Sequence, residues 1–591
     1  MNQNLPQHAQ ASDLIPMPQE VIELASDLLK SSRSFETSDE RTRSAMMARM
    51  MADPSGKQFT MAMADQVLRI PNPKRAAARL SSLIHQFGIP SYLPLLDRIA
   101  IRAGNWAAFV MPKVVMPLVT DRIRKNSDHV IVSADPKELK QYLASRKEAQ
   151  IRVNYNQIGE AVLGEKEANR RLQESISRLQ QPEINYVSVK LSAIASQISL
   201  VGYQQTLDQL RDRLRTIYLT AIAHPAADGS PKFVNLDMEE YRDLQLTVTV
   251  FQSVLDEPEF EALEAGMVIQ AYLPDSFEVL QSLTKWAIER HARTGGRIKL
   301  RLVKGANLAM EKVEASIHGW PQTPYGSKIE SDANFKRLLE YATRPEHVAA
   351  VRVGVASHNL FDIALALLLR ERRGVETQVE FEMLEGMANG QALEVQKRSG
   401  GMLMYSPVVA DEEFEAAVAY LVRRLDENTD DGSFLGAMFS LQPGSSEWDR
   451  QAEAFTKAME LAQSDQLLSQ PRRTQNRLTE SPVIQGVDQP FENEPDTDFA
   501  LPANRQWASE IHERWKDKSI DDIPLCIAGD LQTREATGQG SDPSRPGHAA
   551  YRFAQASSDD VESALTSAAA AQPDWESHDK SPSRSLDNAE R

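Results

Sequence analysis

The chain has 591 residues, 41% of them hydrophobic, and a formal net charge of −17 at pH 7. Its length predicts several domains, and its acidity excludes a nucleic-acid face spread over the whole surface, because binding phosphates needs clustered Lys and Arg. Its one cysteine, Cys526, excludes a disulfide framework and a cysteine-rich metal site and favours a cytoplasmic location. The N-terminus lacks a signal-peptide pattern, and Pro112, Lys113 and Pro117 interrupt the most apolar stretch, so we expect no membrane span.

The first part of the chain is predicted to be helical. From about residue 20 to 148, amphipathic pieces such as "EVIELASDLL" and "RAAARLSSLIHQFG" are separated by Gly or Pro. We therefore assign residues 1–149 to an all-helical arm.

Short apolar runs alternate with helix-like segments after the arm. The runs are "QIRVNY", "YVSVKLS", "KFVNLDM", "GMVIQAY", "IKLRLVKG", "VRVGVAS", "VEFEMLE" and "GMLMYSP". Strand-then-helix units in this number and size are typical of a (β/α)8 barrel, which is an α/β fold and is expected over residues 150–434. A doubly wound open sheet is the alternative.

The end of the chain is predicted to contain a connector and the start of another unit. Residues 435–520 become polar and rich in Pro, Asn and Asp, with one or two helices. Residues 521–591 show a strand followed by a helix.

Polar side chains follow the predicted strands where each strand ends. Because the carboxyl ends of barrel strands meet at one mouth, these side chains should lie together. They are Lys190, Asp237, Gln270, Arg301, Lys304, His358, Asn359, Glu382, Glu385 and Tyr405. The cations among them predict an anion-binding pocket, since buried charges must pair or meet a ligand. For any single residue, an ordinary salt bridge or helix cap is the alternative.

Other kinds of site find no support in the barrel span. It contains neither G-x-G-x-x-G nor a Walker motif, so no Rossmann or P-loop phosphate site is expected there. His358 has no second His or Cys at ligand spacing, so we expect no metal. No G-x-S-x-G or Cys–His arrangement indicates acyl transfer.

The segment "AYLVRRLDEN" is predicted to be the last helix of the barrel. Arg423, Arg424 and Glu427 lie on its polar face. From the pattern alone, these residues either form a solvated surface or bring cations to the barrel mouth.

Seven stretches resemble a known family. They are "YVSVKLSAI", "VNLDMEEY", "GMVIQAYLPD", "RLVKGANLAMEK", "VASHN", "FEMLEGMA" and "YLVRRLDEN", and their order and spacing resemble the proline dehydrogenase domain of bifunctional proline utilization A. The resemblance covers nearly all of residues 150–435. The helices before it also look like that family's arm, and the stretch "NEPDTDFALPANRQWA" with the tail resembles its connector into an aldehyde dehydrogenase half.

The resemblance implies FAD-dependent oxidation of L-proline to Δ1-pyrroline-5-carboxylate. Electrons would pass to a membrane quinone, so a cytoplasmic protein touching the inner face of the membrane is expected. It also implies residue roles. Asp237 and Arg301 would be catalytic. Substrate would be bound by Lys190, Tyr405, Arg423, Arg424, Glu427 and Glu160, the two helix arginines clamping the carboxylate. FAD would contact Met238, Gln270, Lys304, Gly305, Ala306, Ser357 and His358.

The sequence departs from the family in two places. Asn307 follows "KGA", where the family often has an aromatic residue, and only the first segment of the aldehyde dehydrogenase half is present. We therefore expect no pyrroline-5-carboxylate dehydrogenase activity from this chain. It also lacks the family's DNA-binding segment, so no nucleic-acid partner is expected, while assembly into a homo-oligomer is left open. The alternative functions are an inactive remnant that only binds partners and a flavin barrel acting on another amine or acid.

Overall fold

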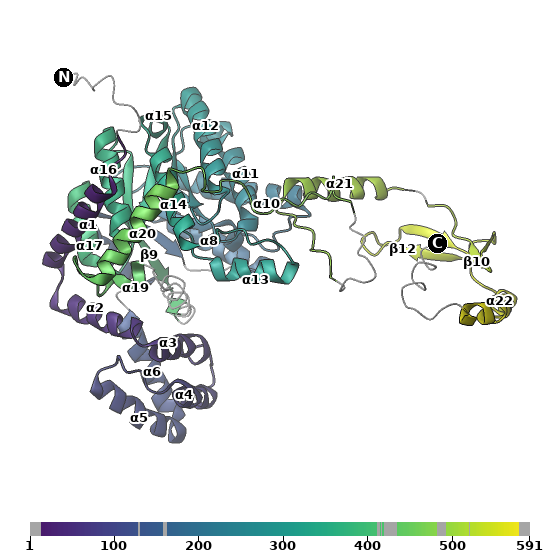
Figure 1. The fold of residues 1–591 in the computed structure, drawn as a ribbon, viewed down its shortest axis with the longest axis horizontal. Helices are drawn as coiled ribbons and strands as arrows, with labels where there is room; N and C mark the ends of the chain where they lie inside the picture. Colours follow the sequence, from purple (N-terminus) through teal and green to yellow (C-terminus); the bar gives the residue numbers. More distant parts are fainter. Residues whose placement is uncertain are drawn as a thin grey trace. The chain divides into compact units, whose positions relative to one another are not determined.

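The computed structural model describes residues 14–127, 130–157, 162–410, 414, 417–418, 434–481, 492–518 and 520–577. The chain forms two compact units, Met1–Thr474 and Gln475–Arg591. The first unit contains the arm, the barrel and part of the expected connector. Figure 1 shows its strands enclosed by helices, with the arm in purple.

The first unit is built on a closed barrel of parallel strands. The strands are β2 (Ile151–Gln157), β3 (Tyr186–Lys190), β4 (Phe233–Asp237), β5 (Ala265–Gln270), β6 (Ile298–Val303), β7 (Val351–Ala356), β8 (Val379–Leu384) and β9 (Met402–Val409). Neighbours pair in chain order, and β9 pairs with both β8 and β2. This closure confirms the predicted (β/α)8 barrel and excludes the open doubly wound sheet.

Polar and apolar residues alternate along several of these strands. In β6, Lys299 and Arg301 alternate with Ile298, Leu300 and Leu302, and all five are buried. Successive side chains of a strand point to opposite faces, so one set faces the outer helices and the other the barrel interior. The sequence of β6 therefore places two cations inside the barrel.

Helices cover the outside of the barrel. They are α8 (Glu165–Gln180), α9 (Leu191–Ile194), α10 (Tyr203–Ala223), α11 (Leu244–Leu255), α12 (Ser276–Thr294), α13 (Leu308–His318), α14 (Lys328–Ala342), α15 (Pro345–Val348), α16 (Leu360–Arg373) and α17 (Asn389–Ser399). At the mouth, the Asn359 side chain caps α16 by accepting a hydrogen bond from the Phe361 N–H (3.0 Å). Glycine ends α16 in a left-handed conformation at Gly374.

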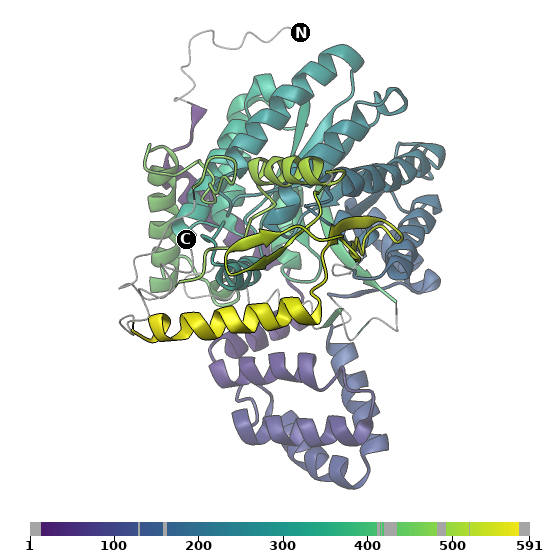
Figure 2. The ribbon, with the colours of Figure 1, turned by 90° about the vertical axis from the view of Figure 1, so that its right-hand side faces the viewer.

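The arm is largely helical, as the sequence predicts, and its described part contains seven α-helices. They are α1 (Pro18–Ser32), α2 (Ser38–Met51), α3 (Pro54–Gln66), α4 (Pro73–Phe87), α5 (Leu95–Val110), α6 (Pro112–Ser127) and α7 (Pro136–Glu148). Helix α1 packs on α16 and α17 of the barrel. Helices α3 to α6, here called the arm bundle, share a core that includes Phe59, Leu80 and Leu83. Figures 1 and 2 both show this bundle as a separate lobe at the bottom of the view.

Two short elements were not predicted. Strand β1 (Val132–Ser133) extends the sheet beside β9, because its residues pair with Val408 and Val409. Helix α19 (Phe434–Met438) follows the barrel. Helix α20 (Ser446–Ala462) packs on α14, so this part of the expected connector belongs to the first unit.

The second unit is small. It contains α21 (Pro502–Trp515), the hairpins β10–β11 (Leu525–Ile527, Asp530–Gln532) and β12–β13 (Gly538–Ser541, Ala549–Phe553), and α22 (Ser558–Ser577). Ser557 and Asp560 cap α22 reciprocally through side-chain bonds to each other's backbone N–H. Within the described chain, no helix is both long and apolar enough to cross a membrane.

Candidate functional site

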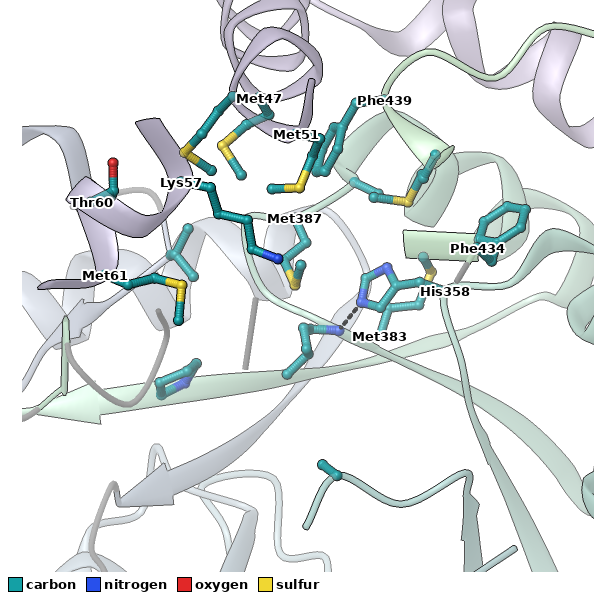
Figure 3. Close-up of a pocket in the computed structure, with 18 of the residues that line it drawn as sticks. Met47, Met51, Lys57, Thr60, Met61, His358, Met383, Met387, Phe434 and Phe439 are labelled. Carbon is teal, nitrogen blue, oxygen red and sulfur yellow. Dashed lines mark hydrogen bonds between the residues drawn. The ribbon is translucent and has the colours of Figure 1, made fainter. Parts of the chain in front are cut away.

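A cavity of about 1910 Å³ lies at the carboxyl ends of the barrel strands. Its wall includes every described residue that the sequence analysis assigned a role, namely Lys190, Asp237, Met238, Gln270, Arg301, Lys304, Gly305, Ala306, Ser357, His358 and Tyr405. The predicted residues Glu160, Arg423, Arg424 and Glu427 lie outside the described residues. Side chains from α2 and α3 also line the cavity, and Figure 3 shows Met47 and Met51 above His358 and Met387.

Arg301 lies at the floor of the cavity, 3% exposed. Its Nη1 donates to Asp237 Oδ1 (2.7 Å) and its Nε donates to Glu382 Oε2 (2.6 Å). Burial alone would lower the pKa of the Arg301 guanidinium, but the charges of Glu382 and Asp237 outweigh burial and raise it. Arg301 is therefore a fixed, permanently charged group held by two carboxylates.

Lys299 forms a second ion pair with the same carboxylate. Its Nζ lies 2.5 Å from Glu382 Oε1 and also contacts Glu380. Burial lowers the pKa of Lys299 to about 7, although Glu382 opposes this shift. The pKa of Glu382 is itself lowered, because Arg301 and Lys299 outweigh the effect of its burial. Glu382 thus links the two cations of β6.

A glycine on the intervening strand leaves room for this cluster. Gly354 of β7 lies between Arg301 of β6 and Glu380 of β8 in the sheet register. A Cβ at Gly354 would lie 2.3 Å from Glu382 Oε1 and 2.8 Å from Lys299 Cε. Any larger residue would therefore push the ion pairs apart.

Tyr405 and Asn235 complete the surroundings of Asp237. Tyr405 Oη donates to Asp237 Oδ2 (2.9 Å), and Asn235 Nδ2 donates to Asp237 Oδ1 (3.0 Å). The guanidinium carbon of Arg301 lies 5.5 Å from the centre of the Tyr405 ring. Asp237 is thus held as an acceptor from three directions, with Tyr405 half-buried beside it.

Lys304 belongs to a separate ion network at the cavity wall. Its Nζ lies 2.5 Å from Asp332 Oδ1 and 2.7 Å from Asp362 Oδ2, and Lys336 also binds Asp362 at 3.2 Å. Burial opposes the charge of Lys304, but Asp332 and Asp362 raise its pKa. The network anchors the loop after β6.

The following residue shows why that loop needs glycine. Gly305 has a φ of 117°, and a Cβ there would lie 2.5 Å from the Tyr272 ring. The backbone at Gly305 therefore packs against Tyr272, and residues 304–306 line the cavity.

Two further predicted residues hold their places through backbone bonds. Gln270 Nε2 donates to the carbonyls of Met238 (3.2 Å) and Glu239 (3.3 Å), while its Oε1 is buried with no hydrogen-bond partner among the described residues. Ser357 Oγ accepts the N–H of Asn359 (3.0 Å). Lys190, a third predicted residue, is held by an ion pair instead, because its Nζ lies 2.5 Å from Glu239 Oε1.

The imidazole ring of His358 is held in one orientation and one tautomer. Its Nε2 accepts the Leu384 N–H (2.9 Å), so the neutral ring carries its proton on Nδ1. Burial lowers the pKa of His358 to about 4. The buried Nδ1 has no hydrogen-bond partner in the described chain. His358 is therefore a neutral donor beside the cavity.

The cations of the cavity do not need a bound anion to balance their charge, contrary to what the sequence predicts. That expectation had Lys190, Arg301 and Lys304 paired by a ligand, whereas each is already paired by a carboxylate of the chain. The presence of three cations in the cavity wall therefore does not by itself indicate an anion-binding site.

Two functional candidates are not predicted from the sequence. Glu382 is expected at a strand end but without a role, and Lys299 is not among the expected site residues. The alternation of charged residues along β6 and β8 could have indicated both. No sequence signal indicated that α2 and α3 would bring Met47, Met51 and Met61 to the same cavity (Figure 3).

The cavity wall suits a flavin. Among the described residues, it combines an unpartnered buried acceptor at Gln270 Oε1, an unpartnered buried donor at His358 Nδ1 and the backbone of Gly305. A flavin ring presents both acceptors and a donor along its polar edge and needs such groups around it. Among the described residues, no group of three or more His, Cys, Asp or Glu could hold a metal ion.

The lowered pKa of His358 predicts a pH dependence of stability. An unfolded histidine takes up a proton near pH 6.5, whereas folded His358 does so only near pH 4. The stability from neutral His358 is therefore fully present above pH 6.5 and is lost as pH falls towards 4. We expect His358→Gln to flatten the fall in unfolding free energy over this range, measured by urea unfolding followed by circular dichroism. The exposed His85→Gln should keep the parent slope, and an unchanged slope in His358→Gln would contradict the assignment.

Comparison with known proteins agrees with this geometry. A family model described as proline dehydrogenase matches residues 139–437. The bifunctional protein PutA of Klebsiella aerogenes is 25% identical over 471 residues, which cover 71% of this chain and 34% of that relative. The chain thus spans about a third of that relative's length.

Solved structures give the same result. Proline utilization A from Bdellovibrio bacteriovorus, inactivated by N-propargylglycine, matches with a TM-score of 0.73 and 27% identity over 96% of this chain and 55% of that one. Proline utilization A from Corynebacterium freiburgense matches with a TM-score of 0.58 and 38% identity over 74% of this chain and 40% of that one. Half of the chain matches the family model, and its barrel places the described motif residues on one cavity. The chain belongs to the proline dehydrogenase family.

Proposed function

We propose that this chain oxidises L-proline to Δ1-pyrroline-5-carboxylate with bound FAD and passes the electrons to a quinone. The proposal rests on the fixed arrangement of Arg301, Asp237 and Tyr405 at the cavity floor. In the same wall, Gln270 Oε1 and His358 Nδ1 have no hydrogen-bond partner among the described residues. FAD would supply the two-electron oxidant, accepting a hydride from the ring carbon next to the proline nitrogen.

The residues of the chain would bind and orient both molecules. Gln270, His358 and the backbone at 304–306 would hold the flavin, with Met238, Lys304 and Ser357 around it. Arg301 and Asp237 would fix the positions of flavin and proline, because their ion pair leaves neither side chain free to turn. The proline nitrogen loses its proton to solvent, so no strong base is needed.

The substrate carboxylate needs further cations. Arg301 is already balanced by two carboxylates, and Lys190 lies beside Glu239. The proposal therefore assigns the carboxylate to Arg423 and Arg424, positioned by Glu427 and assisted by Lys190, because arginine binds a carboxylate with two parallel hydrogen bonds. Glu160 is proposed to lie at the same end of the substrate.

An apolar electron acceptor fits the other side of the cavity. Methionines of α2 and α3 form that wall, among them Met47, Met51 and Met61 (Figure 3). Methionine side chains adapt to flat, apolar ligands. A quinone ring is such a ligand, which supports a quinone rather than a soluble pyridine nucleotide as acceptor.

The visible spectrum of the purified full chain tests the function. We expect flavin absorption bands that L-proline bleaches in the absence of oxygen and that an added quinone restores, and mass spectrometry of the released cofactor should give FAD. D-proline is the matched control, because its carboxylate points elsewhere when its ring is held in the same place. Bands that bleach with another amine or acid but not with L-proline would contradict the substrate.

Tyr405 is expected to contact the proline ring and so to set specificity. Tyr405→Ser opens space and offers a small hydroxyl, which should narrow the preference for L-proline over 4-hydroxyproline by about 1–3 kcal/mol, measured as the ratio of kcat/KM values. Tyr405→Phe is the control: it loses the hydrogen bond to Asp237 but keeps the ring, so the preference should persist. If the ratio is unchanged in Tyr405→Ser, Tyr405 does not contact the substrate ring.

A further inference from the structure

Lys299 lies inside the barrel beneath Arg301, and the proposed contacts with flavin and substrate make no use of its charge. Its side chain is buried, and it is not among the described residues that line the cavity. Its Nζ lies 4.9 Å from the ring centre of Tyr186 and 5.9 Å from that of Phe233. Because a buried ammonium is costly unless it is paired, a lysine at this position needs an explanation.

The charged and titratable side chains that face Lys299 in the described chain come from β2, β3, β6 and β8. Its Nζ donates to Tyr186 Oη (3.1 Å) and forms ion pairs with two carboxylates of β8. Burial raises the pKa of Tyr186, so its hydroxyl stays neutral. The full set is Glu380, Glu382, Arg301, Tyr186 and Arg152.

The carboxylate of Glu382 is shared between the two cations of β6. Lys299 binds Oε1, and Arg301 binds Oε2. With both oxygens held by charged donors, the carboxylate cannot turn, and the guanidinium of Arg301 keeps its direction. A neutral amine binds a carboxylate more weakly than an ammonium does. Loss of the Lys299 proton would therefore let Glu382 turn towards Arg301 and change how Arg301 is held.

Glu380 connects Lys299 with solvent at the end of the barrel opposite the mouth. Lys299, Glu380 and Arg152 are the second residues of β6, β8 and β2, so they lie nearer the amino ends of the parallel strands than Arg301 does. Glu380 binds both Lys299 and Arg152, and the Arg152 side chain is 55% exposed. A proton can therefore leave Lys299 without crossing the cavity, even when flavin and substrate fill it.

We propose that Lys299 is a positioning residue for proline oxidation, whose ammonium, but not its neutral amine, holds Glu382 and through it Arg301 in the orientation that the reaction needs. This role rests on the proposed function. Burial lowers the pKa of Lys299 to about 7, so its charge changes near neutral pH. Arg301 and Glu382 keep their charges there, because the pKa of the guanidinium is raised and that of the carboxyl is lowered.

The pH dependence of flavin reduction by saturating L-proline tests this role in the full chain with bound FAD. Lys299→Met has a side chain of similar length that is neutral at every pH. The parent should be at least about tenfold faster than Lys299→Met near pH 6 and about as fast near pH 9, where its own lysine is neutral. The ionisation of proline affects both proteins and cancels in the ratio. A lysine that only fills space would give the same ratio at every pH, and that result would overturn the proposal.

Two control variants remove other buried titratable groups. Lys232 is also buried, but its Nζ donates to the carbonyls of Leu179 and Gln181 (both 2.5 Å), so the ratio for Lys232→Met should not vary with pH. Burial raises the pKa of Asp243 to about 7, yet Asp243 is not among the described residues of the cavity wall. If Asp243→Asn removes the pH dependence and Lys299→Met retains it, Asp243 is the responsible group and the proposal is wrong.

Glu380→Gln provides a second test that keeps Lys299 in place. The substitution removes a negative charge beside the ammonium, so Lys299 should lose its proton at lower pH than in the parent. Flavin reduction in Glu380→Gln should therefore be slower than in the parent mainly near pH 7 and should match it near pH 9. A ratio to the parent that is independent of pH would refute the role of Lys299, even if Lys299→Met does not fold.

Urea unfolding separates this proposal from the proposed function. An unfolded lysine keeps its proton up to about pH 10.5, whereas folded Lys299 loses it near 7, so unfolding takes up a proton between these values. The unfolding free energy of the parent should therefore rise with pH over this range relative to that of Lys299→Met. If the rise occurs but L-proline does not reduce the flavin, the proposed function fails and the positioning role with it. If L-proline reduces the flavin but the rise is absent, the positioning role alone fails.

Discussion

Two carboxylates and two cations meet inside the barrel of this protein, and all four side chains are buried. Arg301 binds Asp237 and Glu382, and Glu382 also binds Lys299. A buried charge without a partner costs several kcal/mol, so each of these groups depends on the others for its ionised state. Because these side chains bind one another, their hydrogen-bond donors and acceptors are held in fixed orientations at the floor of the cavity. Tyr405 is bound to that floor through Asp237, whereas the proposed flavin contacts lie around it and are held by bonds of their own.

The ion cluster also constrains the sheet. Lys299 and Arg301 on β6 reach Glu382 on β8 across β7, and they can do so because Gly354 has no side chain. The alternation of polar and apolar residues then gives the outer face of the same strands its apolar contacts with the helices. One pattern therefore provides both the packing of the barrel and the charges of its interior. The arm supplies what the barrel lacks, a second and apolar wall for the cavity.

The barrel strands and several residues of its mouth can be predicted from the local pattern of polar and apolar residues in the sequence. Each barrel strand is a short run rich in apolar residues, and a polar residue at or just after the end of a strand lies at the mouth, so Asp237, Gln270 and His358 could be assigned to the mouth from the sequence. The pairing of Lys299 with Glu382 could not, because it depends on the register of three strands and on closure of the barrel. The use of α2 and α3 as a cavity wall depends on how the arm packs on the barrel, which amphipathic periodicity does not specify. The roles of Arg423 and Arg424 remain a prediction from family resemblance.

A double-mutant cycle on Lys299 and Glu382 tests the central claim most directly, with unfolding free energy and the rate of proline-dependent flavin reduction as the two measured quantities. Glu382→Gln alone leaves Arg301 and Lys299 with too little negative charge and should cost about 3–5 kcal/mol of stability and much of the reduction rate. Lys299→Met together with Glu382→Gln removes one charge of each sign and leaves the Arg301–Asp237 pair intact. The account predicts that the double variant recovers part of both losses, with a coupling energy of at least about 1 kcal/mol. Additive effects of the two substitutions on both quantities would contradict it.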